Sequence, residues 1–124
     1  MLPEELGNCQ MYGVELDSIS GRIAQQLYQE ADIRVQGYEK AELPDSFFDV
    51  AIGNVPFGDF KINDKRYDKN NFLIHDYFFA KTIDKIRPGG VIAFITSKGT
   101  MDKANPEVRK YIAQRAELLG AIRL

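Results

Sequence analysis

Short apolar runs alternate with helical segments along this chain, and that alternation constrains the fold more than any other feature. The strongest run, Val91 to Thr96 (VIAFIT), is apolar and rich in β-branched residues, and Arg87-Pro88-Gly89-Gly90 separates it from the helical pattern before it. Continuous apolar strands joined through helices are typical of a parallel sheet covered on both faces. The sequence therefore predicts an α/β fold with a mostly parallel sheet and helices on both faces.

The same periodicity gives the expected elements, which we assign to one domain over residues 1–124. The first helix carries apolar residues at helical spacing, namely Ile19, Ile23, Leu27 and Tyr28, with Asp17 or Ser18 as its N-cap. Pro106 opens the last helix at a position where its missing N–H is not needed. We expect strands at Met11–Leu16, Asp32–Gln36, Phe48–Gly53 and Val91–Thr96, the start of another at Leu119–Leu124, and helices at Ser18–Gln29, Phe72–Ile86 and Pro106 to about Glu117.

Charge is distributed unevenly along the chain. Residues 1–60 hold 3 Lys or Arg and 11 Asp or Glu, whereas residues 61–124 hold 13 and 7. The sequence pI near 5.4 argues against non-specific nucleic-acid binding, but the basic half leaves room for a local surface that faces phosphates. Solvated helix faces explain the same charges equally well.

Cysteine content and hydropathy indicate the cellular compartment in which the protein is expected. Cys9 is alone, which excludes a disulfide framework and a cysteine metal cluster and makes a reducing compartment the expectation. No apolar run is long enough to span a membrane, and the N-terminus lacks a signal-peptide pattern. We therefore expect a cytoplasmic protein with no membrane partner and no metal site.

In open parallel sheets, ligands bind beyond the carboxyl ends of the strands. Glu15 ends the first predicted strand, where a carboxylate can accept hydrogen bonds from the vicinal hydroxyls of a ribose. Asp17 competes for that role, although its position favours the helix cap.

The segment Asn54-Val55-Pro56-Phe57 follows the third predicted strand. Pro56 fixes its own φ and disfavours helix at Val55, so the turn can present the Asn54 amide oxygen and a backbone carbonyl as two acceptors. Two acceptors match an exocyclic amino group, and the Phe57 ring offers a face for base stacking, worth roughly 1–3 kcal/mol per base. A plain turn with Phe57 tucked into the core is the equally weighted alternative.

These residues resemble a known family. Asn54-Val55-Pro56-Phe57 is similar to the Asn-Pro-Pro-Tyr/Phe motif of amino-group methyltransferases, above all the S-adenosylmethionine-dependent N6-adenine DNA methyltransferases. The segments Tyr12–Asp17, Asp49–Asn54 and Arg87–Ile95 follow in the family's order, and the stretch from Phe47 to Leu124 resembles the large methylase–helicase proteins of bacterial mobile elements.

The resemblance implies a Rossmann-like class I methyltransferase core that uses S-adenosylmethionine to methylate a flipped-out adenine in DNA. Asn54 and the carbonyl of Val55 or Pro56 would orient the amino group, and Phe57 would stack on the base. The cofactor would be held by residues after the first two strands, namely Glu15, Leu16, Tyr38 and Glu39. A protein glutamine-amide methyltransferase uses the same motif logic, and a non-catalytic DNA- or protein-binding module is a further alternative.

Two departures from the family pattern bear on activity. Val55 replaces the usual Pro, and the glycine-rich loop that normally precedes the acidic motif is missing. We therefore expect a partial catalytic domain that lacks the first central strand and the last strands and is inactive alone. The strands ending at Glu15 and Asn54 would then keep unpaired edges, which invites self-association.

Basic residues near the motif are candidates for DNA contact. The polar loop Asp59–Asn70 contains Lys61, Lys65 and Arg66, and Lys98 follows the strand that ends at Thr96. A solvated, mobile loop is the alternative for the first three, and solvent exposure the alternative for Lys98. For His75, near the start of an aromatic helix, we expect a capping or partly buried residue in preference to a catalytic one.

Overall fold

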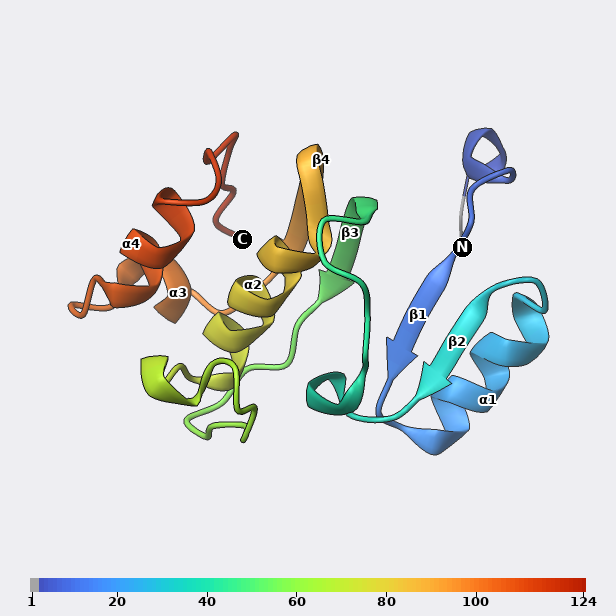
Figure 1. Ribbon diagram of the computed structural model, residues 1–124, viewed down its shortest axis with the longest axis horizontal. Helices are drawn as coiled ribbons and strands as arrows, with labels where there is room; N and C mark the ends of the chain where they lie inside the picture. The colour runs from blue at the N-terminus through green and yellow to red at the C-terminus, as the bar shows by residue number, and fades with distance from the viewer. Residues whose placement is uncertain (1–2) are drawn as a thin grey trace. The chain divides into compact units, whose positions relative to one another are not determined.

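The computed structural model describes residues 3–124, which divide between Glu42 and Leu43 into two compact units. Figure 1 shows the elements in chain order. The first unit contains η1 (Glu4–Leu6), β1 (Tyr12–Glu15), α1 (Ser18–Leu27), β2 (Asp32–Val35) and η2 (Tyr38–Lys40). The second contains β3 (Phe48–Asn54), η3 (Asp68–Asn70), α2 (Ile74–Lys85), β4 (Ile86–Ile95), α3 (Gly99–Asp102) and α4 (Glu107–Ala113).

The first unit is a β-α-β arrangement. β1 and β2 pair in parallel, from Tyr12 opposite Asp32 to Glu15 opposite Val35. Asp17 is the N-cap of α1, because its Oδ2 accepts a hydrogen bond from the Ser20 amide at 2.7 Å, and that hydrogen bond lowers the pKa of the Asp17 carboxyl. The predicted strands and the predicted cap are thus confirmed.

The α1 helix contacts its sheet through a small residue. Gly21 is buried, and a Cβ at this position would lie only 2.7 Å from Val35 Cγ2, so the missing side chain allows the helix to approach β2 closely. The predicted apolar stripe points elsewhere: Ile19, Ile23 and Leu27 are each more than half exposed. The pattern located the helix correctly, but the described residues of this unit do not cover the stripe.

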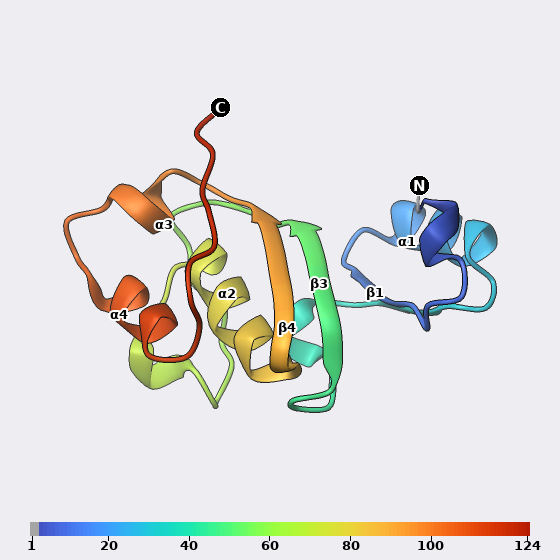
Figure 2. The ribbon, with the colours of Figure 1, turned by 90° about the horizontal axis from the view of Figure 1, so that it is seen from above.

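The second unit is built on a parallel pair of longer strands. β3 and β4 pair from Val50 opposite Val91 to Asn54 opposite Ile95, so their carboxyl ends lie at one edge. Figure 2 shows α2 alongside β4, and α4 beyond α2. On the other face of the strands, apolar side chains stay exposed, namely Val50, Ile52, Val91 and Ile95. Among the described residues, helices therefore cover one face of this sheet and not both.

The Arg87-Pro88-Gly89-Gly90 segment ends the helical pattern, as predicted, but it lies inside β4. Phe48 pairs with Ile86 while Val50 pairs with Val91, so the segment bulges out of the ladder. Gly89 has a φ of +84°, a conformation that glycine adopts without steric cost. The strand therefore starts at Ile86, five residues before the predicted start.

The α/β class and the parallel pairing are confirmed, whereas the single predicted sheet is not. The described residues form two separate two-stranded sheets, and β1 and β3 each pair along one edge only. The strand predicted at Leu119–Leu124 is wrong: residues 119–124 have no regular structure and pair with no described strand. Of the helices in residues 3–124, none has the length and apolar character needed to cross a bilayer.

Candidate functional site

The carboxyl edge of β3 and β4 carries the Asn54–Phe57 turn. Asn54 is the last residue of β3, and the next amide, Val55 N–H, donates to the Ile95 carbonyl at 3.0 Å. Val55 is buried at 3% exposure. The strand ladder therefore continues one residue past β3 and fixes the backbone of the turn to the end of β4.

The side chains on either side of Val55 face solvent. Asn54 and Pro56 are exposed, and Phe57 is 58% exposed. The alternative in which Phe57 is tucked into the core is therefore wrong. A buried anchor between an exposed amide and an exposed ring has the form that an amino-group clamp with a stacking face requires.

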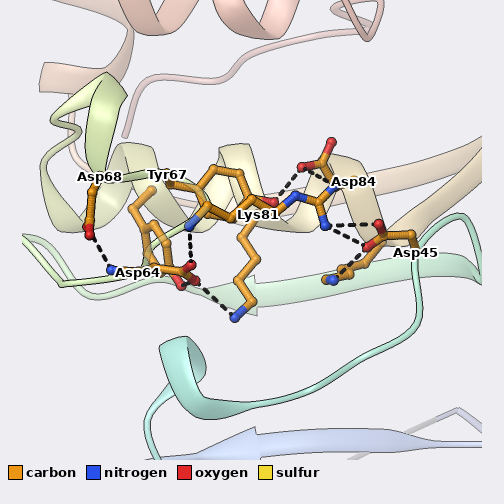
Figure 3. Close-up of polar contacts among 9 residues, drawn as sticks. Asp45, Asp64, Tyr67, Asp68, Lys81 and Asp84 are labelled. Atoms are coloured by element: carbon orange, nitrogen blue, oxygen red, sulfur yellow. Dashed lines mark hydrogen bonds and ion pairs between the residues drawn. The ribbon is translucent and has the colours of Figure 1, made fainter.

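The loop that follows the turn runs along helix α2 from its first turn to its last. The Phe60 carbonyl accepts the Ile74 amide at 3.0 Å at the start of the helix. Asp64 then accepts the Tyr77 hydroxyl at 2.6 Å, and the Tyr67 hydroxyl donates to Asp84 (Figure 3). Because Tyr67 is only 4% exposed, the loop is packed against the helix and is not simply solvated.

Electrostatics in this network favour ionised carboxylates. Burial raises the pKa of the Asp64 carboxyl, but hydrogen bonds from Tyr77 and the Arg66 amide, together with Lys81, outweigh burial and lower the pKa overall. The pKa of Asp45 is also lowered, by hydrogen bonds from Lys85 and then Arg66. Burial and the Asp84 carboxylate raise the pKa of Tyr67, so its hydroxyl stays a donor.

The predicted DNA-contacting residues do not all lie at the edge that carries the Asn54–Phe57 turn. Lys98 follows the carboxyl end of β4 and is exposed, so it shares the edge with Asn54. Arg66 forms ion pairs with Asp45 at 2.9 Å and with Asp84 at 3.3 Å. The backbone carbonyl of Asp84 accepts a hydrogen bond from the Ser46 amide, just before β3. Arg66 is therefore at the amino end of β3, about 20 Å of strand away from Asn54.

The two remaining loop lysines differ from each other. Lys61 Nζ donates to Asn71 Oδ1 at 2.7 Å, which ties together the two ends of the loop. Lys65 is exposed. A phosphate contact stays a prediction for these residues.

In the first unit, the register brings the predicted cofactor residues to one edge. Glu15 ends β1 opposite the end of β2, and Tyr38 and Glu39 follow β2 in η2. Glu15 Oε1 accepts the Asp17 amide at 2.9 Å, so one carboxylate oxygen stabilises the β1–α1 turn. Leu16 is 75% exposed. The Glu39 carboxylate lies close to Gly37, where a Cβ would clash with Glu39 Oε1.

Sequence reasoning missed two features of the second unit. Asp76 is buried in the first turn of α2, where it forms an ion pair with Lys103. Among the described residues, no side-chain hydrogen bond caps α2, so of the two expectations for His75 the buried residue is confirmed and the capping role is wrong. Phe60 is 54% exposed beside the clamp, and the Phe57-Gly58-x-Phe60 spacing was the available signal. Residues 3–124 contain no cluster of three or more His, Cys, Asp or Glu suited to a metal ion.

Comparison with known proteins identifies similar chains. Residues 15–123 match the family described as Eco57I restriction-modification methylase. Over 120 residues the chain is 34% identical to "Defense against restriction protein B" of Escherichia phage P1. That match covers 92% of this chain but 5% of the phage protein, so the chain spans a small part of the relative's length. No solved structure matches the chain.

Proposed function

The chain belongs to the Eco57I restriction-modification methylase family, and from this premise we propose that it forms part of the core of a DNA methyltransferase acting on adenine N6. The observation that carries the proposal is the turn at the end of β3. Asn54 and Phe57 are exposed there while the buried Val55 between them is hydrogen-bonded to β4. A methylase needs such a rigid set of acceptors, since most of its catalysis comes from positioning.

The chemistry of an amino group explains why these residue types serve. The N6 amino group of adenine has two N–H bonds, and the Asn54 amide oxygen and the carbonyl of Val55 or Pro56 supply two acceptors. Two hydrogen bonds of this kind fix the plane of the amino group and direct the nitrogen toward the methyl donor. Phe57 stacks on the base, which must first leave the duplex because its amino group is unreachable in the stack.

The residues of the first unit fit the ribose end of S-adenosylmethionine. A carboxylate at the carboxyl end of a parallel strand, here Glu15 of β1, accepts hydrogen bonds from the vicinal hydroxyls of a ribose. Leu16 follows β1, and Tyr38 and Glu39 follow β2. When bound, S-adenosylmethionine would supply a sulfonium-linked methyl group for transfer to the amino nitrogen, which would lose one proton to solvent as the thioether leaves.

The chain contributes only part of this core, in our proposal. Its sequence contains no glycine-rich loop ahead of Glu15, and β1 and β3 each pair along one edge in the described residues. Both features fit an enzyme whose central strand and methionine-binding loop are supplied by other segments of a longer protein. DNA is the proposed partner of that protein, and self-association through the open edges is proposed for the chain alone.

Labelled methyl transfer tests the proposed function. The full-length protein that contains this chain is incubated with S-adenosylmethionine labelled in the methyl group and with genomic DNA, and the nucleosides are then separated. We expect label in N6-methyladenine, and a loss on the order of 100-fold with Asn54→Ala, by analogy with the removal of one preorganised oxyanion-hole donor, which costs about this much. Asn8→Ala, which changes an exposed asparagine in the other unit, is the matched control and keeps the wild-type rate.

The other outcomes separate the rival functions. Label in protein glutamine and none in DNA would establish the glutamine-amide methyltransferase. Full DNA methylation by Asn54→Ala would show that the turn is not the clamp. No transfer to either acceptor by a folded, full-length protein would favour a non-catalytic binding module.

A further inference from the structure

A second aromatic side chain stands beside the clamp. Phe57 is 58% exposed and Phe60, three residues later, is 54% exposed. Other aromatic residues of this unit pair with each other: Phe72 packs edge-on against Tyr111, and Phe79 against Phe94. Within the described residues, neither Phe57 nor Phe60 takes part in a ring–ring contact.

The Phe60 ring lies against Gly58, which stands between the two phenylalanines in the sequence. A Cβ at Gly58 would lie 2.7 Å from Phe60 Cε1 and 2.8 Å from Cδ1, so the Phe60 ring occupies space that any other residue at position 58 would fill. Gly58 does not have a positive φ, so its backbone conformation does not demand glycine. A side chain at position 58 would instead displace the exposed Phe60 ring.

The backbone is anchored at both ends of this short segment. Val55 N–H donates to the Ile95 carbonyl, and the Phe60 carbonyl accepts the Ile74 amide, each at 3.0 Å. Three residue steps separate Phe57 from Phe60, so their Cα atoms lie at most about 11 Å apart. The segment therefore presents two exposed rings, within about 11 Å of each other along the backbone, from a chain that is anchored on both sides.

We propose that Phe60 stacks on the nucleobase that flanks the target adenine, while Phe57 stacks on the adenine itself. This inference rests on the proposed function. Enzymes that extrude a base read its flanking nucleotides, and aromatic side chains bind successive unstacked bases by stacking. Phe60 thereby stabilises the extruded strand and positions the target without touching the amino group.

A cycle of protein and DNA changes tests the stacking directly. Sequencing of DNA methylated by the full-length protein first locates the modified adenine. Synthetic duplexes then carry either the natural base or an abasic nucleotide on each side of it, and kcat/KM is measured on each duplex. On the natural duplex we expect Phe60→Leu to lower kcat/KM roughly 5- to 150-fold, which corresponds to the stacking of one base. On one of the abasic duplexes, Phe60→Leu and wild type should be equal.

Two further variants separate the position of the ring from its presence. Phe60→Tyr keeps a stacking face and should retain activity within about threefold on the natural duplex. Gly58→Ala keeps the Phe60 ring but displaces it, so it should lower kcat/KM by less than Phe60→Leu does, again only when the flanking base is present.

The results that overturn this inference differ from those that overturn the proposed function. Equal loss by Phe60→Leu on natural and abasic duplexes would mean that the ring packs against protein, and no loss on any duplex would mean that it contacts nothing needed for turnover. In both cases wild type still methylates adenine and Asn54→Ala does not. Absence of wild-type adenine methylation would instead refute the proposed function.

Discussion

Asp64 is the residue whose replacement should most weaken the attachment of the loop Asp59–Asn70 to helix α2. Its Oδ2 accepts the Tyr77 hydroxyl at 2.6 Å and lies 3.4 Å from Lys81 Nζ, and its Oδ1 accepts the Arg66 amide at 3.1 Å (Figure 3). The side chains of Asp64 and Lys81 are 14% and 6% exposed, and Tyr77 is 2% exposed. Asp64→Ala removes an acceptor from donors that water reaches poorly.

The structure bounds the size of the effect. A buried donor that loses its partner costs about 1–3 kcal/mol, and hydrogen bonds to a charged group lie in the upper half of that range. Asp64→Ala removes one acceptor from a buried hydroxyl and from a buried ammonium, each of which keeps a further interaction, so we expect a loss in the free energy of unfolding of about 1–3 kcal/mol. Arg66 of the same loop pairs with Asp45, which precedes β3, and both side chains are about half exposed; pairs of this kind contribute at most about 1 kcal/mol.

Urea denaturation of the protein measures this difference at constant pH. Tyr77→Phe and the double variant complete a cycle, in which the coupling energy between Asp64 and Tyr77 should reach at least about 1 kcal/mol. Asp59→Ala removes an exposed carboxylate from the same loop and should change the stability by less than about 0.5 kcal/mol. A loss below 1 kcal/mol for Asp64→Ala, or additive single effects, would refute the argument that this carboxylate holds the loop.

Three further predictions concern pH, the clamp backbone and the cofactor. Because the folded pKa of Asp64 lies below its ordinary value of 3.8, its contribution is complete above that value and is lost as the pH falls through the folded pKa. The difference in unfolding free energy between wild type and Asp64→Asn, measured in urea, should therefore be constant near neutral pH and shrink below about pH 4. A difference that grows on acidification would contradict a lowered pKa for Asp64. Val55→Pro removes the donor to Ile95 and should destabilise the protein by about 1–3 kcal/mol in thermal unfolding, whereas Val55→Ile, which keeps the N–H, should cost less than about 1.5. Calorimetric titration of this chain alone with S-adenosylmethionine should give no micromolar binding, and micromolar binding would contradict the proposal that other segments complete the cofactor site.

The parts of the fold that short-range chemistry determines were predictable from the sequence. Asp17 caps α1 through a bond to a residue three positions on, and Arg87-Pro88-Gly89-Gly90 ends the helical pattern by its own backbone preferences. The strand ends that carry the candidate residues were also predictable, because parallel strands bring their carboxyl ends together, but the expectation of one edge on a single sheet is not confirmed in the described residues. The Asn54 turn and Lys98 accordingly share one edge, and Glu15 shares another with Tyr38.

The parts that depend on distant partners were not predictable. Leu119 to Leu124 has an apolar pattern, but a strand requires a neighbour, and Leu119, Ile122 and Leu124 stay largely exposed in the structure. The many charged residues of the loop at 59–70 favoured a solvated loop. Its attachment to α2 depends on the hydrogen bond between Asp64 and Tyr77, which are 13 residues apart. Neither pairing has a local signal that periodicity or propensity can detect.

The departure at Val55 illustrates how a structure can change the meaning of a sequence difference. Against the Asn-Pro-Pro-Tyr/Phe pattern, Val in place of Pro reads as a loss of rigidity in the turn. In the structure, the Val55 amide donates to Ile95, a bond that proline cannot make, and the side chain is buried. The turn is therefore held by the last rung of the β3–β4 ladder in place of a pyrrolidine ring. Its orientation is tied to the end of β4, so changes in the loop after Ile95 should alter the position of Asn54 through this hydrogen bond.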